Sequence, residues 1–335
     1  MDLLTQGLLG GALALAVSRK SESRKAAVVG FAAALLADAD VFISASDDPL
    51  LNLELHRHFT HSLIFIPIGA FIATLLLWPL MRKRIEFKKI YTYALLGYGT
   101  AGVLDACTSY GTHLLWPFSE TRIAWSIIAI VDPVFSLLLL ITLIIGFRYY
   151  KPLAPRIGLG LAGCYLMLGL WQHQSALQSA LELAEQRNHE VQSIIVKPTL
   201  ANLLLWRSVY QSNDRFYVDA IRVGLVSNRI YVGETIAKFK LERDLPQLDK
   251  ASTLSNDILR FSRLADGYVV PDPNRDKVLI DVRYSMLPND VSAMWGIDLD
   301  TASVSQHVQF KVYRDRPDNA RDVFMAMLMG RDLPD

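Results

Sequence analysis

The stretch DADVFISASDDPLLNLELHRHFTHS, residues 38–62, joins two apolar segments and contains a dense set of acidic and imidazole side chains. The set comprises two aspartates and three histidines: Asp38, Asp40, His56, His58 and His61. Such groups are costly to place between apolar segments unless something binds them. They supply the oxygen and nitrogen ligands that zinc and manganese accept, and no cysteine lies nearby. The stretch therefore predicts a divalent metal site, with an ordinary solvated loop as the alternative.

The rest of the chain divides by composition. It has 335 residues, 52% of them hydrophobic, and most of its charged residues lie beyond position 174. We therefore expect an α-helical membrane bundle of about six transmembrane helices, followed by a small soluble α+β domain. The expected parts are a membrane domain with the metal site at 1–173, an amphipathic helical connector at 174–198 and the soluble domain at 199–335. A net charge of +1 gives no case for nucleic-acid binding.

Six apolar segments approach the ~20 residues that a membrane-spanning helix needs. They are Met1–Val17, Ala26–Ala37, Leu63–Met81, Ile90–Cys107, Ile127–Phe147 and Ile157–Trp171. Lys and Arg concentrate in loops 18–25, 82–89 and 148–156, which predicts that these loops are cytoplasmic. The soluble domain is then periplasmic in a bacterial inner membrane. With this topology the candidate ligands all lie at the outer membrane face: Asp38, Asp40, His61, Asp105 and Asp132.

Beyond Pro198, runs rich in β-branched and aromatic residues predict strands. The expected strands are Leu203–Tyr210, Arg215–Val223, Arg229–Val232, Val278–Tyr284 and Val308–Tyr313, and the expected helices are Ser255–Ala265 and Arg321–Met329. This domain contains no pattern of residues that suggests catalysis. Its acids and bases are best interpreted as a solvated surface.

Spacing restricts how the candidate ligands can meet. Asp38 and Asp40 would point about 200° apart in a regular helix, so the backbone must leave α-helical geometry if both reach one site. Thr60 is a plausible N-cap of the helix that follows, with Ser62 as a second capping residue. Asp132, which precedes Pro133, is either a helix cap or a ligand.

In these residues the chain resembles the bacterial membrane-bound metal-dependent hydrolases of the YdjM-like family. The matching elements cover residues 1 to about 140. They are Thr5-Gln6, Asp38-x-Asp40, His56-Arg57-x-x-Thr60-His61-Ser62, Leu104-Asp105-x-x-Thr108-x-Tyr110-Gly111-Thr112, Pro117-Phe118 and Asp132-Pro133. The resemblance implies an integral inner-membrane protein classed as a hydrolase by its metal motif.

One position departs from the family pattern. Family members commonly carry a histidine four residues before the Asp of the second cluster, and here that position is Ala101. Either His113 replaces this ligand from the loop, or the site is reduced.

The implied chemistry is metal-assisted hydrolysis. The expected ligands of zinc, or alternatively manganese, are Asp38, Asp40, His56, His61 and Asp105. The expected catalytic groups are His113, Asp132 and Arg57. The expected substrate-binding groups are Arg57, Arg122 and Thr108. The expected partners are membrane lipids and an amphiphilic substrate, with a lipid phosphoester as the leading choice.

Two other classes remain open. A transporter also places acids and histidines in a helical bundle, although such sites usually lie near the midplane. A non-catalytic membrane scaffold with a residual metal site is the third possibility, and Ala101 is the feature that favours it.

Overall fold

The computed structural model describes residues 1–335 except 44, 46, 301–305, 316 and 335. The chain forms two compact units. The helical unit consists of Met1–Ile43, Leu55–Trp171 and Leu200–Leu203, and the sheet unit consists of Ser44–Glu54, Gln172–Thr199 and Leu204–Asp335.

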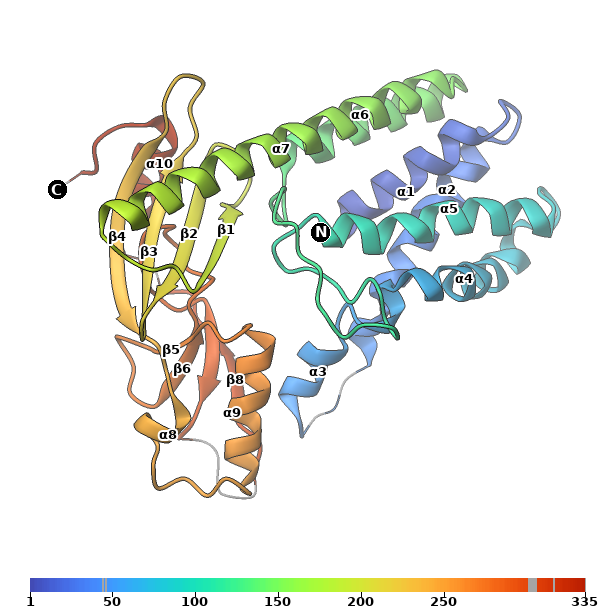
Figure 1. The fold of residues 1–335 in the computed structure, drawn as a ribbon. Helices are drawn as coiled ribbons and strands as arrows, with labels where there is room; N and C mark the ends of the chain where they lie inside the picture. Colours follow the sequence, from blue (N-terminus) through green and yellow to red (C-terminus); the bar gives the residue numbers. More distant parts are fainter. Residues whose placement is uncertain (44, 46, 301–305, 316, 335) are drawn as a thin grey trace. The chain divides into compact units, whose positions relative to one another are not determined.

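The helical unit is a bundle of apolar helices that run side by side, coloured blue to green in Figure 1. Its helices are α1 (Leu3–Val17), α2 (Ser23–Leu36), α4 (Ile66–Met81), α5 (Phe87–Ala106), α6 (Pro133–Tyr149) and the first part of α7 (Leu153–Gln186). Three short 3-10 helices interrupt the chain between α2 and α4: η1 (Ala37–Phe42), η2 (Phe59–His61) and η3 (Leu63–Phe65).

Glycines bring α1, α2 and α5 into close contact. A Cβ atom added to Gly30 of α2 would lie 2.4 Å from the carbonyl oxygen of Gly10 in α1. A Cβ atom added to Gly97 of α5 would lie 2.2 Å from the carbonyl oxygen of Gly30. Small residues at such contacts let helices approach closely in a membrane, where dispersion forces drive helix association. The three glycines therefore determine how tightly the bundle packs.

Gly30→Val is expected to destabilise this bundle, because its side chain would overlap the α1 backbone. Overpacking of this kind costs about 1–3 kcal/mol. Thermal unfolding of the detergent-solubilised chain should show a lower transition temperature. The matched control is Gly160→Val in α7, where an added Cβ meets nothing within 4 Å. Equal transition temperatures for the two variants would contradict this account of the packing.

Within the described residues, only two helices are long and apolar enough to cross a membrane by length and composition: Leu63–Met81 and Leu153–Gln186. The expectation of about six such helices is therefore wrong. Two of the other expected spans are shorter apolar helices, namely α1 with 15 residues and α6 with 17. α2 has only 14 residues because the chain turns into η1 after Leu36. α5 has 20 residues but contains many glycines, tyrosines and threonines.

The outer surface of the helical unit is nevertheless apolar. Several helices expose large side chains, among them Leu3, Leu4, Phe71, Leu75, Leu76, Leu80, Leu137, Ile141, Ile144, Ile157 and Leu161. An apolar surface of this extent marks a membrane or protein contact. The bundle is thus suited to a lipid environment along α1, α4, α6 and the first part of α7.

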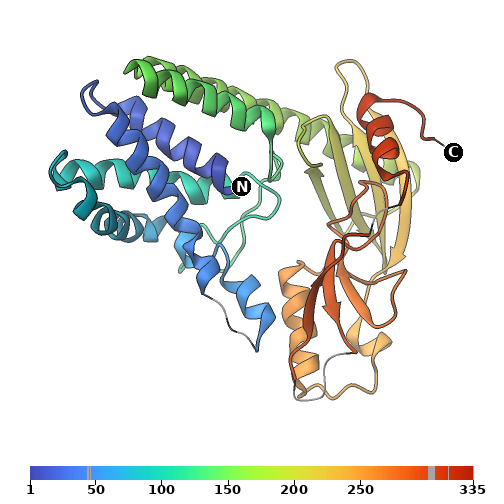
Figure 2. The same ribbon diagram turned by 180° about the vertical axis from the view of Figure 1, so that it is seen from behind.

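The sheet unit contains two four-stranded antiparallel sheets (Figure 1, Figure 2). The first has the order β1 (Ser193–Pro198), β2 (Leu205–Ser212), β3 (Arg215–Arg222) and β4 (Arg229–Ala237). The second has the order β5 (Val269–Pro271), β6 (Val278–Asp281), β7 (Trp295–Asp298) and β8 (Gln309–Val312). The helices of this unit are α3 (Pro49–Leu55), α8 (Leu241–Asp244), α9 (Thr253–Leu264), α10 (Ala320–Met329) and the last part of α7.

The core of the sheet unit lies between the two sheets. Phe216 of β3 stacks on Tyr268 with ring centroids 4.9 Å apart, and Val270 and Ile280 of the second sheet join the same cluster. α9 covers the other side of the second sheet, because its buried Ile258 and Phe261 pack with Leu279. These contacts hold the two sheets together as one unit.

Arg207 of β2 lies inside this unit with its guanidinium surrounded by backbone carbonyls. Its Nη1 donates to the carbonyl oxygens of Leu287, Pro288 and Asp290 at 2.8–3.1 Å, and its Nη2 donates to that of Val282 at 2.8 Å. These bonds satisfy carbonyls that a loop would otherwise bury without partners. Arg207 therefore fixes the chain that follows β6.

Lys197 of β1 has a buried side-chain amine whose charged neighbours are Arg207, Asp281 and Arg283. Its Nζ lies 3.0 Å from the centroid of the Tyr284 ring. Burial, and next the charge of Arg207, lower the pKa of Lys197 well below its usual value. Because the unfolded chain then binds more protons than the folded chain above neutral pH, the free energy of unfolding should rise with pH toward the ordinary lysine pKa.

Lys197→Met should flatten this rise, whose slope for one proton is at most about 1.4 kcal/mol per pH unit. Urea unfolding at pH 7, 8 and 9, followed by the sheet signal in circular dichroism, measures it. Lys250→Met, at a side chain that is mostly exposed, is the control. Parallel pH profiles for the wild type and Lys197→Met would contradict the prediction.

Candidate metal centre

Asp38 and Asp40 lie on η1, directly after α2 ends at Leu36. The change from an α-helix to a 3-10 helix is the departure from regular geometry that their spacing requires. Both side chains are buried. Asp38 belongs to two groups of possible metal ligands. One group consists of Asp38, His61 and Asp105, and the other consists of Asp38, Asp40 and His56. Within each group the donor atoms are no more than 4.8 Å apart.

His61 lies among three carboxylates. Its Nε2 is 3.2 Å from Asp105 Oδ2 and 3.5 Å from Asp38 Oδ1, while its Nδ1 is 3.5 Å from Asp40 Oδ2. Burial alone would lower the pKa of His61, but Asp105, Asp38 and Asp40 stabilise the charged ring and raise this pKa to about 10. The cluster therefore attracts positive charge strongly.

The approach of His61 to α5 depends on Gly102. A Cβ atom added to Gly102 would lie 2.1 Å from the carbonyl oxygen of His61. Gly102 is one turn of α5 before Asp105, so this contact brings the imidazole and the carboxylate together. Nearby, Tyr98 of α5 donates its hydroxyl hydrogen to the carbonyl oxygen of Thr60 at 2.8 Å.

Asp40 organises the turn that carries His56. Its carboxylate lies 3.0 Å from His56 Nδ1 and accepts hydrogen bonds from the Arg57 backbone N–H at 2.8 Å and the Thr60 hydroxyl at 2.7 Å. Burial would raise the pKa of Asp40, but hydrogen bonds from His56, His61 and Thr60 hold it well below its usual value. Asp40 is therefore ionised and orients the His56 ring.

Asp105 already has cationic and polar neighbours besides His61. The Met1 amino group pairs with its Oδ1, and Gln6 Nε2 donates to its Oδ2 at 3.0 Å. Arg57 Nε lies 3.1 Å from the same Oδ2. Of these residues, Gln6 was not proposed as a site residue from the sequence, although a glutamine inside an apolar helix was a usable signal.

The donor set fits a divalent metal. Ligands of a tetrahedral zinc lie ~2.0–2.2 Å from the ion and hence about 3.3–3.6 Å from each other. The 3.2 Å and 3.5 Å separations around His61 Nε2 are close to this range. Among the described residues, His61 Nε2 and Asp38 Oδ2 are also buried without a hydrogen-bond partner. A buried polar atom without a partner is energetically costly, so these two atoms favour a bound ligand.

Thr60 and Ser62 do not cap α4, and Ser62 is the N-cap residue of the short η3 without a side-chain capping bond. The Thr60 hydroxyl donates to Asp40, and the Ser62 hydroxyl donates to the carbonyl oxygen of Phe59 at 2.7 Å. The expectation is wrong because η2 and η3 occupy this segment and delay the start of α4 to Ile66. Thr60 instead holds Asp40.

Asp132 and Thr108 have structural partners. Asp132 caps α6 by accepting from the Phe135 backbone N–H at 3.0 Å, and it accepts from the Tyr165 hydroxyl at 2.9 Å. The Thr108 hydroxyl donates to the carbonyl oxygen of Asp105 at 2.8 Å. The capping alternative for Asp132 is thus the one that the structure supports, and Asp132 does not join the metal-type groups found among the described residues.

His113 lies beside His58 and Glu120, in a group that excludes Asp105. Its backbone N–H donates to the carbonyl oxygen of Arg57 at 3.3 Å, which holds it on that side of the turn. Burial, and next the charge of Arg122, lower the pKa of His113 to about 4. The suggestion that His113 compensates for Ala101 at Asp105 therefore gains no support. Ala101 itself is fully buried in the core of the helical unit.

The helical unit is where the chain matches a known family. The model of the YdjM inner membrane protein family matches residues 1–176, which is more than half of the chain. The chain belongs to the YdjM inner membrane protein family. The matched segment includes every residue of the metal-type groups.

The YdjM-family chain also resembles the "Uncharacterized protein YfhP" of Bacillus subtilis (strain 168). The two are 28% identical over 196 residues, which is 56% of this chain and 58% of that protein. The match thus spans less than two thirds of the length of this relative. No solved structure matches the YdjM-family chain. Membership makes it an inner membrane protein, in agreement with its two candidate spans.

Proposed function

We propose that this YdjM-family chain is a membrane-bound, metal-dependent hydrolase that acts on an amphiphilic phosphoester at the outer face of the inner membrane. The observation that carries the proposal is the convergence of Asp38, His61 and Asp105 from η1, η2 and α5. All three side chains are buried; Arg57 and the Met1 amino group offset the charge of Asp105, and a bound cation would offset the remaining carboxylate charge. Asp40 adds a further carboxylate beside Asp38.

A bound zinc or manganese ion would supply a water of lowered pKa and polarise the oxygen under attack. The protein's own residues position the other groups. His56 is partly exposed, with 29% of its side chain accessible, and its Nδ1 lies 3.0 Å from Asp40. This pairing leaves Nε2 to accept a proton from water as a general base. In this proposal His56, which the sequence predicted as a metal ligand, acts as the general base in place of the predicted catalytic groups His113 and Asp132.

Arg122 is the better placed arginine for an anionic substrate group. Its guanidinium lies 4.8 Å from the centroid of the Tyr110 ring and 3.5 Å from the carbonyl oxygen of His56. Arg57 is buried, pairs with Asp105 and donates to the carbonyl oxygen of Met1, so its charge is used inside the site. Guanidinium groups bind phosphate well, which supports a phosphoester as the substrate class.

The distribution of basic residues supports the outer face as the side on which the site lies. Basic residues lie in the loops at the far ends of the helices from Asp38 and His61, among them Lys20, Lys83 and Lys151. Because basic loops stay in the cytoplasm, the candidate metal centre would face the periplasm. A substrate reaching this interface carries both a polar and an apolar part.

The proposal is tested on the full chain in detergent micelles. Metal content is measured first, and then hydrolysis of bis-p-nitrophenyl phosphate and of phospholipids in mixed micelles, before and after chelation. We expect hydrolysis to disappear with the chelator and to return with zinc or manganese. Glu86→Gln, at an exposed carboxylate outside the cluster, is the control. If the rate of hydrolysis is the same with and without the chelator, the proposal of metal-dependent hydrolysis is wrong.

A non-catalytic scaffold is the second candidate, because Asp105 already pairs with Arg57 and the Met1 amino group. These pairs connect α1, the His56–Ser62 turn and α5 without any reaction. Bound metal with no hydrolysis of any phosphoester or carboxylic ester tested would favour the scaffold.

A further inference from the structure

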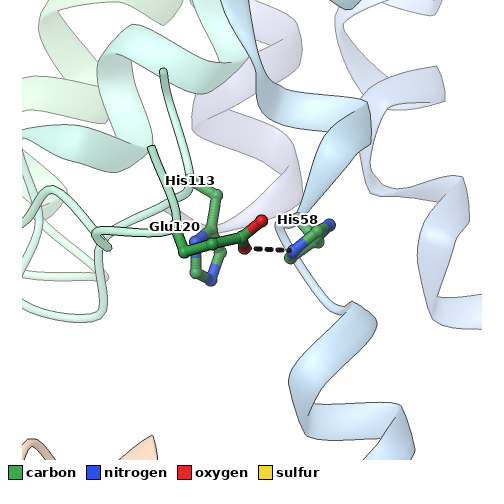
Figure 3. A group of neighbouring side chains, drawn as sticks. All are labelled: His58, His113 and Glu120. Atoms are coloured by element: carbon green, nitrogen blue, oxygen red, sulfur yellow. Dashed lines mark ion pairs between the residues drawn. The ribbon is translucent and has the colours of Figure 1, made fainter. Parts of the chain in front are cut away.

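We propose that His58, His113 and Glu120 form a second transition-metal site, separate from the Asp38–His61–Asp105 cluster. The three side chains come from the turn before η2 and from the loop that follows α5. Figure 3 shows the Glu120 carboxylate facing His58, with His113 beside it. Their donor atoms lie within 4.8 Å of one another, and the group shares no residue with the first cluster.

The geometry of the three groups favours one shared ligand. His58 Nε2 is 3.5 Å from Glu120 Oε2, and the ring centroids of His58 and His113 are 4.6 Å apart. The rings are tilted by 50° and so are not stacked face to face. Donor atoms at this spacing need only small side-chain rotations to reach the ~3.3–3.6 Å separations of a tetrahedral centre.

A buried nitrogen points to the same conclusion. Among the described residues, Nδ1 of His113 is buried and has no hydrogen-bond partner. A buried imidazole nitrogen without a partner is a natural metal ligand. The ring of His58 is also held in place, since it packs against Trp116 with centroids 5.8 Å apart. These contacts restrict the rotamers and prepare the imidazoles for binding.

The backbone is positioned for the site as well. The Thr112 hydroxyl and the His113 N–H both donate to the carbonyl oxygen of Arg57, at 2.9 Å and 3.3 Å. The loop and the turn are thus already joined where the two imidazoles meet. A metal here would clamp the loop to the turn that carries His56 and His61.

The ligand type predicts which metal binds. Two imidazoles and one carboxylate suit Zn²⁺, Co²⁺, Ni²⁺ or Cu²⁺ and disfavour Ca²⁺ and Mg²⁺, which take oxygen ligands. The first cluster is richer in carboxylates than this site. The two sites should therefore differ in affinity for the same ion and in their spectra.

The test measures Co²⁺ and Zn²⁺ binding to the full chain in detergent, by visible absorption of Co²⁺ and by elemental analysis for zinc. His113→Gln and Glu120→Gln should each weaken one equivalent of metal at least tenfold. Glu120 is 75% exposed at its side chain, so Glu120→Gln leaves folding intact. Thr121→Ala, at the exposed neighbouring residue, is the matched control and should bind as the wild type does.

The outcomes separate this site from the proposed hydrolase centre. If Asp38→Asn removes metal while His113→Gln and Glu120→Gln change nothing, the second site is refuted and the first stands. If the His113 and Glu120 variants each lose an equivalent in an Asp38→Asn background, the second site stands by itself. Equal loss of metal in Thr121→Ala would also refute it, because the effect would then come from the loop as a whole.

Discussion

Asp38→Asn is expected to abolish tight metal binding at the candidate centre and to lower hydrolysis at least about 100-fold, since even residues that only support ligands alter affinity or activity by 10–100-fold. Among substitutions of the candidate ligands, Asp38→Asn should weaken metal binding most. Asp38 belongs to both donor groups, one with His61 and Asp105 and one with Asp40 and His56. Asparagine keeps the size of the side chain but removes its charge. The loss should therefore come from weaker coordination while packing is preserved.

The measurement pairs metal content with the hydrolysis assay at saturating zinc. Asp132→Asn is a demanding control, because Asp132 is another buried aspartate of the helical unit but caps α6. It should lower stability while keeping the metal. If Asp38→Asn retains full metal and full hydrolysis, the proposal that the Asp38–His61–Asp105 cluster is a catalytic metal centre is wrong.

Arg207→Ala should lower the free energy of unfolding of the sheet unit by about 4 kcal/mol, because removing one partner from a buried charged network leaves polar groups unsatisfied. Four backbone carbonyls, those of Val282, Leu287, Pro288 and Asp290, would lose their donor together. Urea unfolding measures the total loss. Amide hydrogen exchange should show the earliest opening at residues 282–290.

Arg215→Ala in β3 is the matched control, because Arg215 is exposed and its guanidinium donates to the carbonyl oxygen of Thr235 over a long distance of 3.5 Å. It should change the free energy of unfolding by less than about 0.5 kcal/mol. If the two variants are equally stable, Arg207 does not organise the loop.

Local patterns predicted most of the sheet unit. Alternation of β-branched and aromatic residues located β2, β3, β4, β6 and β8, and apolar periodicity located α9 and α10. β5 and β7 were missed because strands of three and four residues are too short to show a period. β1 was missed because residues 193–198 follow a strongly helical run and were included in the connector.

For the site, chemistry was easier to predict than geometry. The identities of Asp38, Asp40, His56, His61 and Asp105 suggested a metal, and the structure places these side chains in two groups of three that share Asp38. The partners of His113 could not be predicted, since its direction depends on a backbone hydrogen bond to Arg57, 56 residues earlier. The number of membrane spans was overestimated because apolar composition does not reveal where η1 shortens α2.

The absence of a side chain at Gly102 has a consequence for how the centre assembles. The backbone of His61 contacts α5 at that glycine. His61 and Asp105 therefore reach their positions only when the His61 segment packs against α5. A metal titration would then measure how closely the helices pack as well as the affinity of the ligand side chains. A lipid or a mutation that separates these two segments would then weaken metal binding at the proposed centre without touching a ligand side chain.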